Sequence, residues 1–419
     1  MPCPLKRKTP GYRLGVEYKE RVLEYSRQIK QSSEERIAMQ HAIKAAKTGF
    51  FPSVDFSGSY QYRINKYDLD FGPGMSVEMD HNTYSLGATV SQPIYAGGQI
   101  YNNYKAAQVQ GKITEQAEEL TTDNIVYSAD LNYWTAAARK GMYDVMCQYV
   151  DIVGELANVL TIRFNDGQIS KTDLLQVESR LKEAELNKSS AYKEYQIALQ
   201  NLNSLMGVSP LDPIEVEDSI TTYLALPLQV GEDVALRNRP DYAISELNIE
   251  YQKRQINLSK AKYNPSLAIG FQGTWGTPML NVKGSDQLWT PAVFASLKIP
   301  LFRWGARFKE VNSQKAILRS KEYALDNTRD KIAQEVANAW TSLTEYTKQI
   351  TVAEEACKIA EENLDLNTFS YNEGKLPILD VLSAQLSWIQ SYSSLIQTWY
   401  QQKASLAQYN KAIGIRRLQ

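Results

Sequence analysis

Few side chains in this sequence could carry enzymatic chemistry or hold a metal ion. The chain has three cysteines and two histidines, namely Cys3, Cys147, Cys357, His41 and His81. The cysteines are too scattered for a disulfide framework or a zinc site, and two isolated histidines give little material for acid–base or metal chemistry. The sequence also lacks a phosphate-cradling glycine loop, an HExxH motif and a G-x-S-x-G motif. We therefore predict that the protein is not an enzyme, has no cofactor and has no catalytic metal.

Each of these residues has an ordinary structural interpretation. Cys357 falls on an apolar helical stripe and is predicted to pack in a core. His41 lies in a helical segment without a partner histidine and is predicted at the surface. His81 lies in a loop; its alternative interpretation is a metal ligand. Cys3 lacks the preceding apolar segment that lipidation requires, so lipidation is not expected.

Charge and hydropathy exclude several classes of protein. The 46 Lys and Arg nearly cancel the 47 Asp and Glu, so neither a nucleic-acid-binding surface nor an acidic tail is indicated. No apolar run reaches the roughly 18 residues of a transmembrane helix, which predicts that no such helix is available. Barrel strands stay possible, since they need only about 9–11 residues of alternating pattern. Residues 1–18 are basic but lack an apolar h-region, so they do not make a complete signal peptide.

The sequence is an internal duplication with one offset of 207 positions and no gap from Pro93 to Gly207. The residue pairs that share this offset are Pro93–Pro300, Gly98–Gly305, Tyr133–Trp340, Phe164–Tyr371, Gly167–Gly374, Asp173–Asp380 and Gly207–Gly414. We predict a first structural repeat at 17–208 and a second at 236–415, joined by a proline-richer connector at 209–235. Residues 1–16 are expected to be disordered, and 416–419 form a C-terminal tail.

Each repeat is predicted to contain a helix, two strands and two further helices. The stretch from 94 to 209 has no proline and is divided only at the turn FNDGQIS (164–170), which YNEGKLP (371–377) matches in the second repeat. The predicted helices are 17–48, the two halves of 94–209, 236–262, 304–371 and 378–413. The predicted strands are 51–66, 82–93, 265–277 and 289–300, and 68–80 is predicted to be a loop.

The predicted strands alternate between apolar and polar residues. In the first strand Val54 and Phe56 fall on one face, and Asp55 and Ser57 fall on the other. Aromatic residues lie towards the loop-side ends of the strands and form a predicted barrel rim of Tyr60, Tyr62, Tyr84, Trp275 and Trp289. This pattern suits a lipid-facing barrel around a wet lumen. An ordinary antiparallel sheet with one buried face produces the same alternation, and the strands alone do not separate the two.

The long helices carry a coiled-coil pattern. In the second repeat, apolar residues step by four and three from Ile332 to Leu364, which is a heptad seam. A helix of about 68 residues is roughly 100 Å long, so it must lie beside other helices. In each repeat, the summed length of the two shorter helices is nearly the length of the long helix. The two shorter helices could therefore stack end to end beside the long one.

Four strands cannot close a barrel, because small closed barrels need about eight. The sheet edges must therefore pair between chains. Two chains would give eight strands with a filled lumen, whereas three would give 12 strands around an open channel, so a trimer is preferred. The predicted fold is mainly α with a small β part, in which three chains share a long α-helical barrel and a 12-stranded transmembrane β-barrel.

This pattern resembles the TolC-type outer membrane factor family, the outer membrane efflux proteins. The resemblance covers roughly residues 17–415 and is weakest before residue 36. It rests on the duplicated plan and on motifs that are individually weak but occur in the right order. These motifs are GFFPSVDFSGSY, AKYNPSLAIGFQG, VSQPIYAGGQ, LKIPLFRWGA, RFNDGQISKTDLLQVES, SYNEGKLPILDVLSAQ and RNRPD (237–241).

The resemblance implies a homotrimer in the cell outer membrane, in contact with outer-membrane lipid, with its helical barrel in the periplasm. Such a channel-tunnel would conduct substrate passively in a tripartite efflux or type I secretion system. Its partners would be a periplasmic adaptor (a membrane fusion protein) and an inner-membrane pump, without any nucleic acid. The main alternative is a non-channel coiled-coil scaffold protein; a truncated, non-exported relic and an enzyme of unknown type are weaker ones.

The resemblance also assigns site residues. The two turns become periplasmic tips that meet the adaptor, formed by Phe164, Asn165, Asp166, Gly167, Tyr371, Asn372, Glu373 and Gly374. Asp173 and Asp380 correspond to acidic positions near the closed tunnel entrance, where a trimer would form rings of carboxylates that favour cations. Some relatives have a second acid where this chain has Ser383, which implies an entrance gate of lower charge. For Asp173 the alternative is a helix capping box, since SKTD (170–173) has the required spacing.

Overall fold

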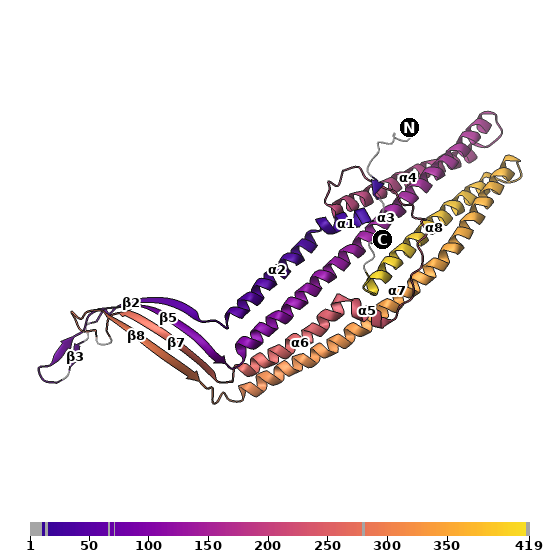
Figure 1. Ribbon diagram of the computed structural model, residues 1–419. Coiled ribbons are helices and arrows are strands. Elements are labelled where there is room, and N and C mark those ends of the chain that lie inside the picture. Colours follow the sequence, from indigo (N-terminus) through magenta and orange to yellow (C-terminus); the bar gives the residue numbers. More distant parts are fainter. Residues whose placement is uncertain (1–10, 13–15, 66–67, 71, 279–280, 416–419) are drawn as a thin grey trace. The chain divides into compact units, whose positions relative to one another are not determined.

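The computed structural model of the chain describes residues 11–12, 16–65, 68–70, 72–278 and 281–415 (Figure 1). Its elements in chain order are β1 (Gly11–Tyr12), α1 (Val16–Tyr25), α2 (Arg27–Thr48), β2 (Ser53–Tyr62), β3 (Asp68–Asp70), β4 (Ser76–Glu78), β5 (Asn82–Ala96), α3 (Gln99–Asn165), α4 (Lys171–Met206), β6 (Glu215–Val216), α5 (Glu232–Asn238), α6 (Pro240–Ala261), β7 (Ser266–Gly276), β8 (Leu288–Lys298), α7 (Ala306–Asn372) and α8 (Ile378–Ala412). The architecture is mainly helical with a small β part, as the sequence predicts.

Two glycine turns end the long helices. Gly167 follows α3 and Gly374 follows α7, and both have a φ of +74°. Glycine adopts this left-handed conformation without the steric cost that a Cβ brings. In the first turn, Ser170 then caps α4, because its hydroxyl accepts a hydrogen bond from the Asp173 amide at 3.1 Å. Each long helix and the shorter helix after it are therefore joined by a turn whose residues specify it locally.

The chain divides into two compact units, which we call the helical unit and the sheet unit. The helical unit comprises the described residues of 1–33, 116–243 and 327–419, and the sheet unit comprises those of 34–115 and 244–326. Neither unit coincides with a predicted repeat, since each takes segments from both. A helix pair that cannot bury its apolar face alone needs a neighbour, and the clusters around Tyr133 and around Leu160 each join residues of both repeats.

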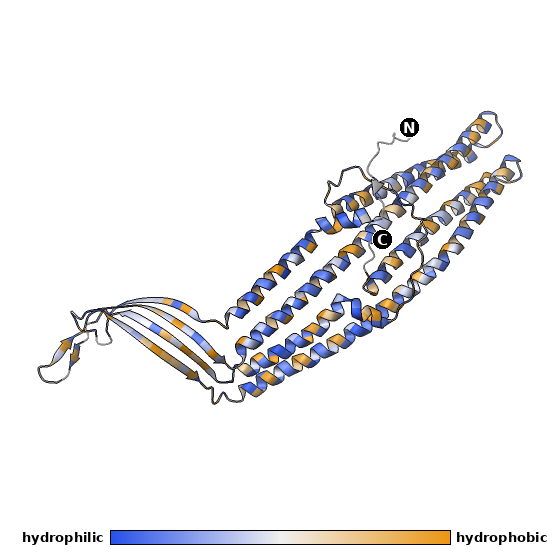
Figure 2. Cartoon of the chain, in the orientation of Figure 1, coloured by the Kyte–Doolittle hydropathy of each residue, from blue (hydrophilic) through white to orange (hydrophobic). Residues whose placement is uncertain are grey.

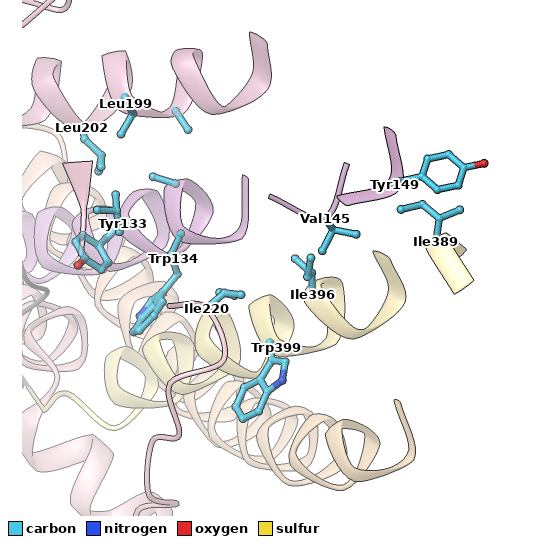
Figure 3. Close-up of a cluster of buried hydrophobic side chains, with 14 of the residues drawn as sticks. Tyr133, Trp134, Val145, Tyr149, Leu199, Leu202, Ile220, Ile389, Ile396 and Trp399 are labelled. Atoms are coloured by element: carbon cyan, nitrogen blue, oxygen red, sulfur yellow. The ribbon is translucent and has the colours of Figure 1, made fainter. Parts of the chain in front are cut away.

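The core of the helical unit joins α3, α4, the connector and α8. Figure 3 shows part of this cluster, including Tyr133, Trp134, Val145, Tyr149, Leu199, Leu202, Ile220, Ile389, Ile396 and Trp399. In α7 the predicted heptad seam is confirmed: Ile332, Ala339 and Leu343 are fully buried, and Leu364 is buried at its far end. The period of the apolar residues thus identified the face of α7 that packs against other helices.

A buried lysine fastens the connector to this core. Lys403 of α8 is 1% exposed, and its ammonium lies 5.0 Å from the ring centroids of both Trp134 and Trp399. The ammonium donates a hydrogen bond to the carbonyl of Thr222 in the connector. Cation–π contacts and this hydrogen bond compensate in part for removing the charge from water. The connector is therefore ordered against α8 even though little of it is regular structure.

The environment of Lys403 predicts a pH-dependent stability. Burial lowers the pKa of Lys403 to about 8, although Asp218 opposes this shift. In the unfolded chain the pKa of a lysine is about 10.4, so between these two pKa values the unfolded state holds a proton that the folded state has released. The free energy of unfolding should therefore rise with pH in this window.

We expect the melting temperature of the detergent-solubilised protein to rise between pH 8 and about 9.5, below the range in which tyrosines titrate. In Lys403→Met this rise should be absent. A wild-type melting temperature that falls with pH, or that matches the variant throughout, would contradict the prediction.

Two of the predicted helices are each divided into two. The helix predicted at 17–48 breaks at Ser26 into α1 and α2, where the Ser26 hydroxyl accepts a hydrogen bond from the Ile29 amide at 3.4 Å and competes with the backbone. The helix predicted at 236–262 begins earlier, at Glu232, and breaks at Pro240 into α5 and α6. Arg239 is extended there, with φ −82° and ψ 122°, as a residue before proline must be.

The break at Pro240 places Arg239 at a junction of three helices. Its guanidinium pairs with Asp241 at 2.6 Å and with Glu335 of α7, and it donates to the Ala412 carbonyl of α8 at 3.4 Å. The motif RNRPD (237–241) thus fastens the start of α6 to α7 and α8.

The four long strands form one antiparallel sheet in the order β2-β5-β7-β8. The central pair, β5 and β7, joins the two repeats, with Ser85 opposite Gly276 and Ala96 opposite Ser266. A bulge between Pro93 and Tyr95 interrupts this register, since proline has no N–H to donate. Among the described residues β2 and β8 each pair with one strand only, so the sheet has two open edges.

Several boundaries differ from the predicted ones. β2 is shorter than 51–66, whereas β5 continues to Ala96, and the loop predicted at 68–80 contains the short β3–β4 pair. Residues 1–16 do not all fit the predicted disorder, because Gly11–Tyr12 form β1, which pairs in parallel with β6 of the connector. Residues 1–10, 13–15 and 416–419 lie outside the described residues, so the expectations for those segments stay predictions.

The prediction that no helix could cross a membrane needs correction. α3 contains an 18-residue window that is long and apolar enough for a membrane span by length and composition. The core helix of a soluble protein passes the same test, and α3 supplies buried residues such as Tyr133 and Trp134 to the helical core. Since 33% of that window is buried, packing in the helical core accounts for part of the apolar character of α3.

Candidate functional site

The predicted docking residues lie at the two turns, but they are not equally exposed. Asn165, Asp166 and Gly167 are exposed in the first turn, as are Asn372, Glu373 and Gly374 in the second. Phe164 is half-buried and Tyr371 is buried, because both contact apolar residues of the surrounding helices. The polar residues and glycines therefore form the accessible surface of the tips.

An apolar cluster joins the two tips of one chain, and we call it the tip core. It contains residues of α3, α4, α7 and α8 that are at most 8% exposed, namely Leu156, Ala157, Leu160, Leu174, Val177, Tyr371, Ile378, Val381 and Leu382. Arg163 of the first tip also contacts residues of the second tip. Its guanidinium lies 5.2 Å from the Tyr371 ring centroid and donates to the Asn372 side chain at 3.2 Å. The two hairpins are thus coupled within a single chain.

Asp173 is engaged in capping α4. Its amide donates to the Ser170 hydroxyl at 3.1 Å, and its carboxylate accepts from the same hydroxyl at 2.9 Å. This is the geometry of the capping interpretation that the sequence left open. The carboxylate is half-buried and keeps acceptor capacity for a second partner.

Asp380 and Ser383 occupy the first turns of α8. Asp380 is exposed, and its backbone amide donates to the Pro377 carbonyl at 3.1 Å. Ser383 is also exposed, and its hydroxyl donates to the Leu379 carbonyl at 2.8 Å. Among the described residues no hydrogen bond or ion pair joins Asp380 to Asp173.

The sheet has one apolar and one polar face, and the apolar face is uncovered. On β2 Phe56 is 75% exposed, and on β8 Val293 is 84% exposed. The opposite face carries hydroxyls and carboxylates, with Ser59 and Ser85 hydrogen-bonded across strands at 3.0 Å. Figure 2 shows hydrophilic and hydrophobic residues mixed along all four strands. A sheet that buries one face in its own unit would cover Phe56 and Val293, so the ordinary-sheet alternative is disfavoured.

The predicted rim aromatics line up across the strands. Tyr60 is opposite Tyr84 in the β2–β5 pair, and Trp275 is opposite Trp289 in the β7–β8 pair. The rings of Tyr84 and Trp275 are 6.1 Å apart between centroids and link the two pairs. Tyr62 stacks on His81 at 5.7 Å. The five aromatics therefore form one band at the loop end of the sheet.

The described cysteines and His81 have ordinary packing and hydrogen-bonding surroundings. Cys357 is buried in α7, as predicted, and Cys147 is a half-buried free thiol. His81 contacts the Arg63 carbonyl at 2.7 Å, and no group of three or more potential metal ligands occurs among the residues that the structure describes. Cys3 lies outside those residues.

A family model described as "Outer membrane efflux protein" matches residues 19–208 and 233–415. The chain belongs to the outer membrane efflux protein family. This confirms the resemblance seen in the sequence, and the family is one of outer membrane transport proteins rather than of enzymes.

Individual relatives are distant but cover much of the chain. The chain is 25% identical to nodulation protein T of Rhizobium leguminosarum bv. trifolii over 60% of its length and 55% of that protein, so it spans about half of this relative. It is 18% identical to the outer membrane protein TolC of Escherichia coli over 92% of the chain and 79% of TolC. The crystal structure of the outer membrane protein VceC from Vibrio cholerae has a TM-score of 0.80, at 17% identity and 95% coverage of both chains. These matches establish the outer membrane efflux protein fold for the chain.

Two groups of residues with a structural role in this chain were not among the site residues predicted from the sequence. Arg163 and Lys403 are single basic residues in helical segments, and only the contacts across helices reveal what they hold together. The segment after β8 belongs to the motif LKIPLFRWGA, whose apolar and basic residues are readable in the sequence, but the motif does not reveal that their side chains are exposed.

Proposed function

We propose that the chain is one protomer of a homotrimeric outer-membrane channel whose three sheets close into a 12-stranded barrel. The uncovered apolar face of the sheet carries this proposal, because bilayer lipid is the environment that suits Phe56 and Val293. The open edges of β2 and β8 support it as well. Long strand edges that stay unpaired invite association, and pairing β2 of one chain with β8 of the next would close the sheet without edges.

The helical segments would form a periplasmic tunnel that conducts substrate passively. An inner-membrane pump would supply the energy, and a periplasmic adaptor would contact the exposed tip residues Asn165, Asp166, Asn372 and Glu373. A polar, water-filled path is consistent with the hydroxyl-rich face of the sheet.

Opening of the entrance would involve the tip core. The two hairpins of one chain share apolar contacts and the Arg163 bridge to Tyr371 and Asn372, so splaying them apart must break these interactions. An adaptor that binds the open arrangement more tightly would shift the population towards it. Disulfides that clamp neighbouring tips should block transport, and transport that survives such clamping would rule out this opening movement.

The first test is the mass of the purified protein with and without detergent. A detergent-dependent trimer of three 47.4 kDa chains would support the shared barrel, and conductance in planar bilayers would then be measured. A monodisperse soluble monomer would reject the channel and favour the coiled-coil scaffold.

The acidic positions of the entrance gate predict ion selectivity. Three copies of exposed Asp380 would attract cations, so Asp380→Asn should shift the reversal potential of the channel in a KCl gradient towards that of an unselective pore. Asp173→Asn should have a smaller effect, because the Asp173 carboxylate is already engaged by Ser170. Unchanged selectivity in Asp380→Asn would show that this residue is not part of the gate.

A further inference from the structure

Trp304 combines an exposed indole with an unfavourable backbone conformation. It is the one non-glycine residue with a positive φ among the described residues, at +46°, and it is 86% exposed. A bulky side chain rarely adopts this conformation, because its Cβ crowds the following carbonyl. A residue kept in such a position points to a function for its side chain.

The first repeat shows that this position favours glycine. Gly97 lies 207 positions before Trp304, has a φ of +63° and is buried. A Cβ on Gly97 would lie 2.6 Å from the Ala261 carbonyl oxygen, so no side chain fits there. Trp304 instead follows β8, the edge strand, where the indole finds open space.

Trp304 belongs to an exposed apolar and basic segment, Leu301–Phe308, which we call the junction segment. Leu301, Phe302 and Phe308 are all more than 70% exposed, and the rings of Phe302 and Trp304 are 5.0 Å apart between centroids. The segment follows β8, which ends at Lys298, and carries its apolar side chains in exposed positions beyond the end of the strand.

Basic residues alternate with these apolar side chains along the sequence and continue into α7. From 298 to 321 the basic residues are Lys298, Arg303, Arg307, Lys309, Lys315, Arg319 and Lys321, and Glu310 is the single acid. Glu310 is already engaged by Lys262 at 3.3 Å and by Tyr263. Arg303 is exposed, with its guanidinium 5.6 Å from the Tyr263 ring centroid. The junction segment therefore presents cationic groups beside exposed aromatic rings.

We propose that the junction segment is a phospholipid-binding site, in which Trp304 and Phe302 lie at the membrane interface and Arg303 and Arg307 bind the phosphate of an anionic headgroup. Tryptophan and tyrosine favour the interface because one part of the ring system is apolar and another is polar. Arginine binds phosphate through paired N–H donors. This inference rests on the proposed barrel, and it assigns each protomer a lipid site in the second repeat that Gly97 prevents in the first.

The test uses the full-length protein reconstituted in vesicles that contain phospholipid brominated on the acyl chain near the headgroup. The chain has seven tryptophans, so the emission of Trp304 is obtained as the difference between wild type and Trp304→Gly. Brominated phosphatidylglycerol and brominated phosphatidylcholine are compared at equal fractions. We expect at least about fivefold higher occupancy near Trp304 for phosphatidylglycerol, since each basic residue near an anionic surface contributes about that factor.

The double variant Arg303→Gln/Arg307→Gln should lose this preference while Trp304 is still quenched by both lipids. The matched control Arg319→Gln/Lys321→Gln removes two exposed basic residues further along α7 and should keep it. Equal quenching by the two lipids in the wild type would overturn the anionic site. Absent quenching, together with weaker trimers in Trp304→Gly, would show that a neighbouring copy of the chain covers the indole. A protein that does not insert into vesicles at all would reject the proposed function together with this inference.

Discussion

Replacing Val293 with arginine should destabilise the protein in a bilayer by about 2–4 kcal/mol, the cost of a lipid-facing arginine near the membrane midplane. Val293 lies in the middle of β8, opposite Phe271, and is 84% exposed. If lipid surrounds this face, the arginine must lose hydration or distort the bilayer. Denaturant unfolding in phosphatidylcholine vesicles, and the heat resistance of the trimer, would measure the loss.

The matched control is Ser296→Arg, three residues further along the same strand. Ser296 is exposed on the opposite face, which the proposal assigns to the lumen, so an arginine there should have little effect on stability. A soluble scaffold gives a different result, because Val293 would then face water and both substitutions would be nearly neutral. Equal stability of the two variants in the bilayer would contradict the lipid-facing assignment.

Leu160→Ala should destabilise the closed arrangement of the tips and raise the fraction of time for which the channel is open. Leu160 is 0% exposed in the tip core, and truncating a buried leucine costs about 2–5 kcal/mol. The loss falls on contacts that couple the two hairpins of one chain, so the closed arrangement should be destabilised relative to the open one. Single-channel recordings should show a larger open fraction than in the wild type.

Leu343→Ala serves as the control for a general loss of stability. Leu343 is also 0% exposed, but it packs with Ile332, Tyr409 and Ile413 in a cluster that contains no tip residue. Its replacement should lower the melting temperature to a similar extent and leave the open fraction unchanged. If both variants raise the open fraction alike, the effect reports overall destabilisation and the tip core has no special role in the gate.

Much of the secondary structure was predictable because it depends on local chemistry. The 207-residue offset brought Gly167 and Gly374 into register, and both have the same left-handed φ in the structure. The heptad seam of α7 identified buried residues such as Ile332 and Leu343 directly, since a helical period determines which side chains share a face. The alternation in β2 and β8 likewise predicted which residues lie together on one face of the sheet.

Other local features were missed where a nearby residue overrides the pattern. The helices predicted at 17–48 and 236–262 run through Ser26 and Arg239, yet a serine hydroxyl and the following Pro240 interrupt the helices there. The capping role of Asp173 could only be stated as one of two alternatives, because the same carboxylate suits both a capping box and a charged ring.

The sequence by itself therefore determined the long helices, the four long strands, the duplication and the family resemblance, since these follow from residue spacing along the chain. The tertiary structure decided which faces are covered: Val293 and Phe56 stay exposed while Tyr371, predicted to dock a partner, is buried in the tip core. It also decided the contacts of Arg163, Lys403 and Arg239, whose partners lie on other segments of the chain. Burial and these pairings depend on which distant segments meet, and the spacing of residues along one segment carries no information about its neighbours.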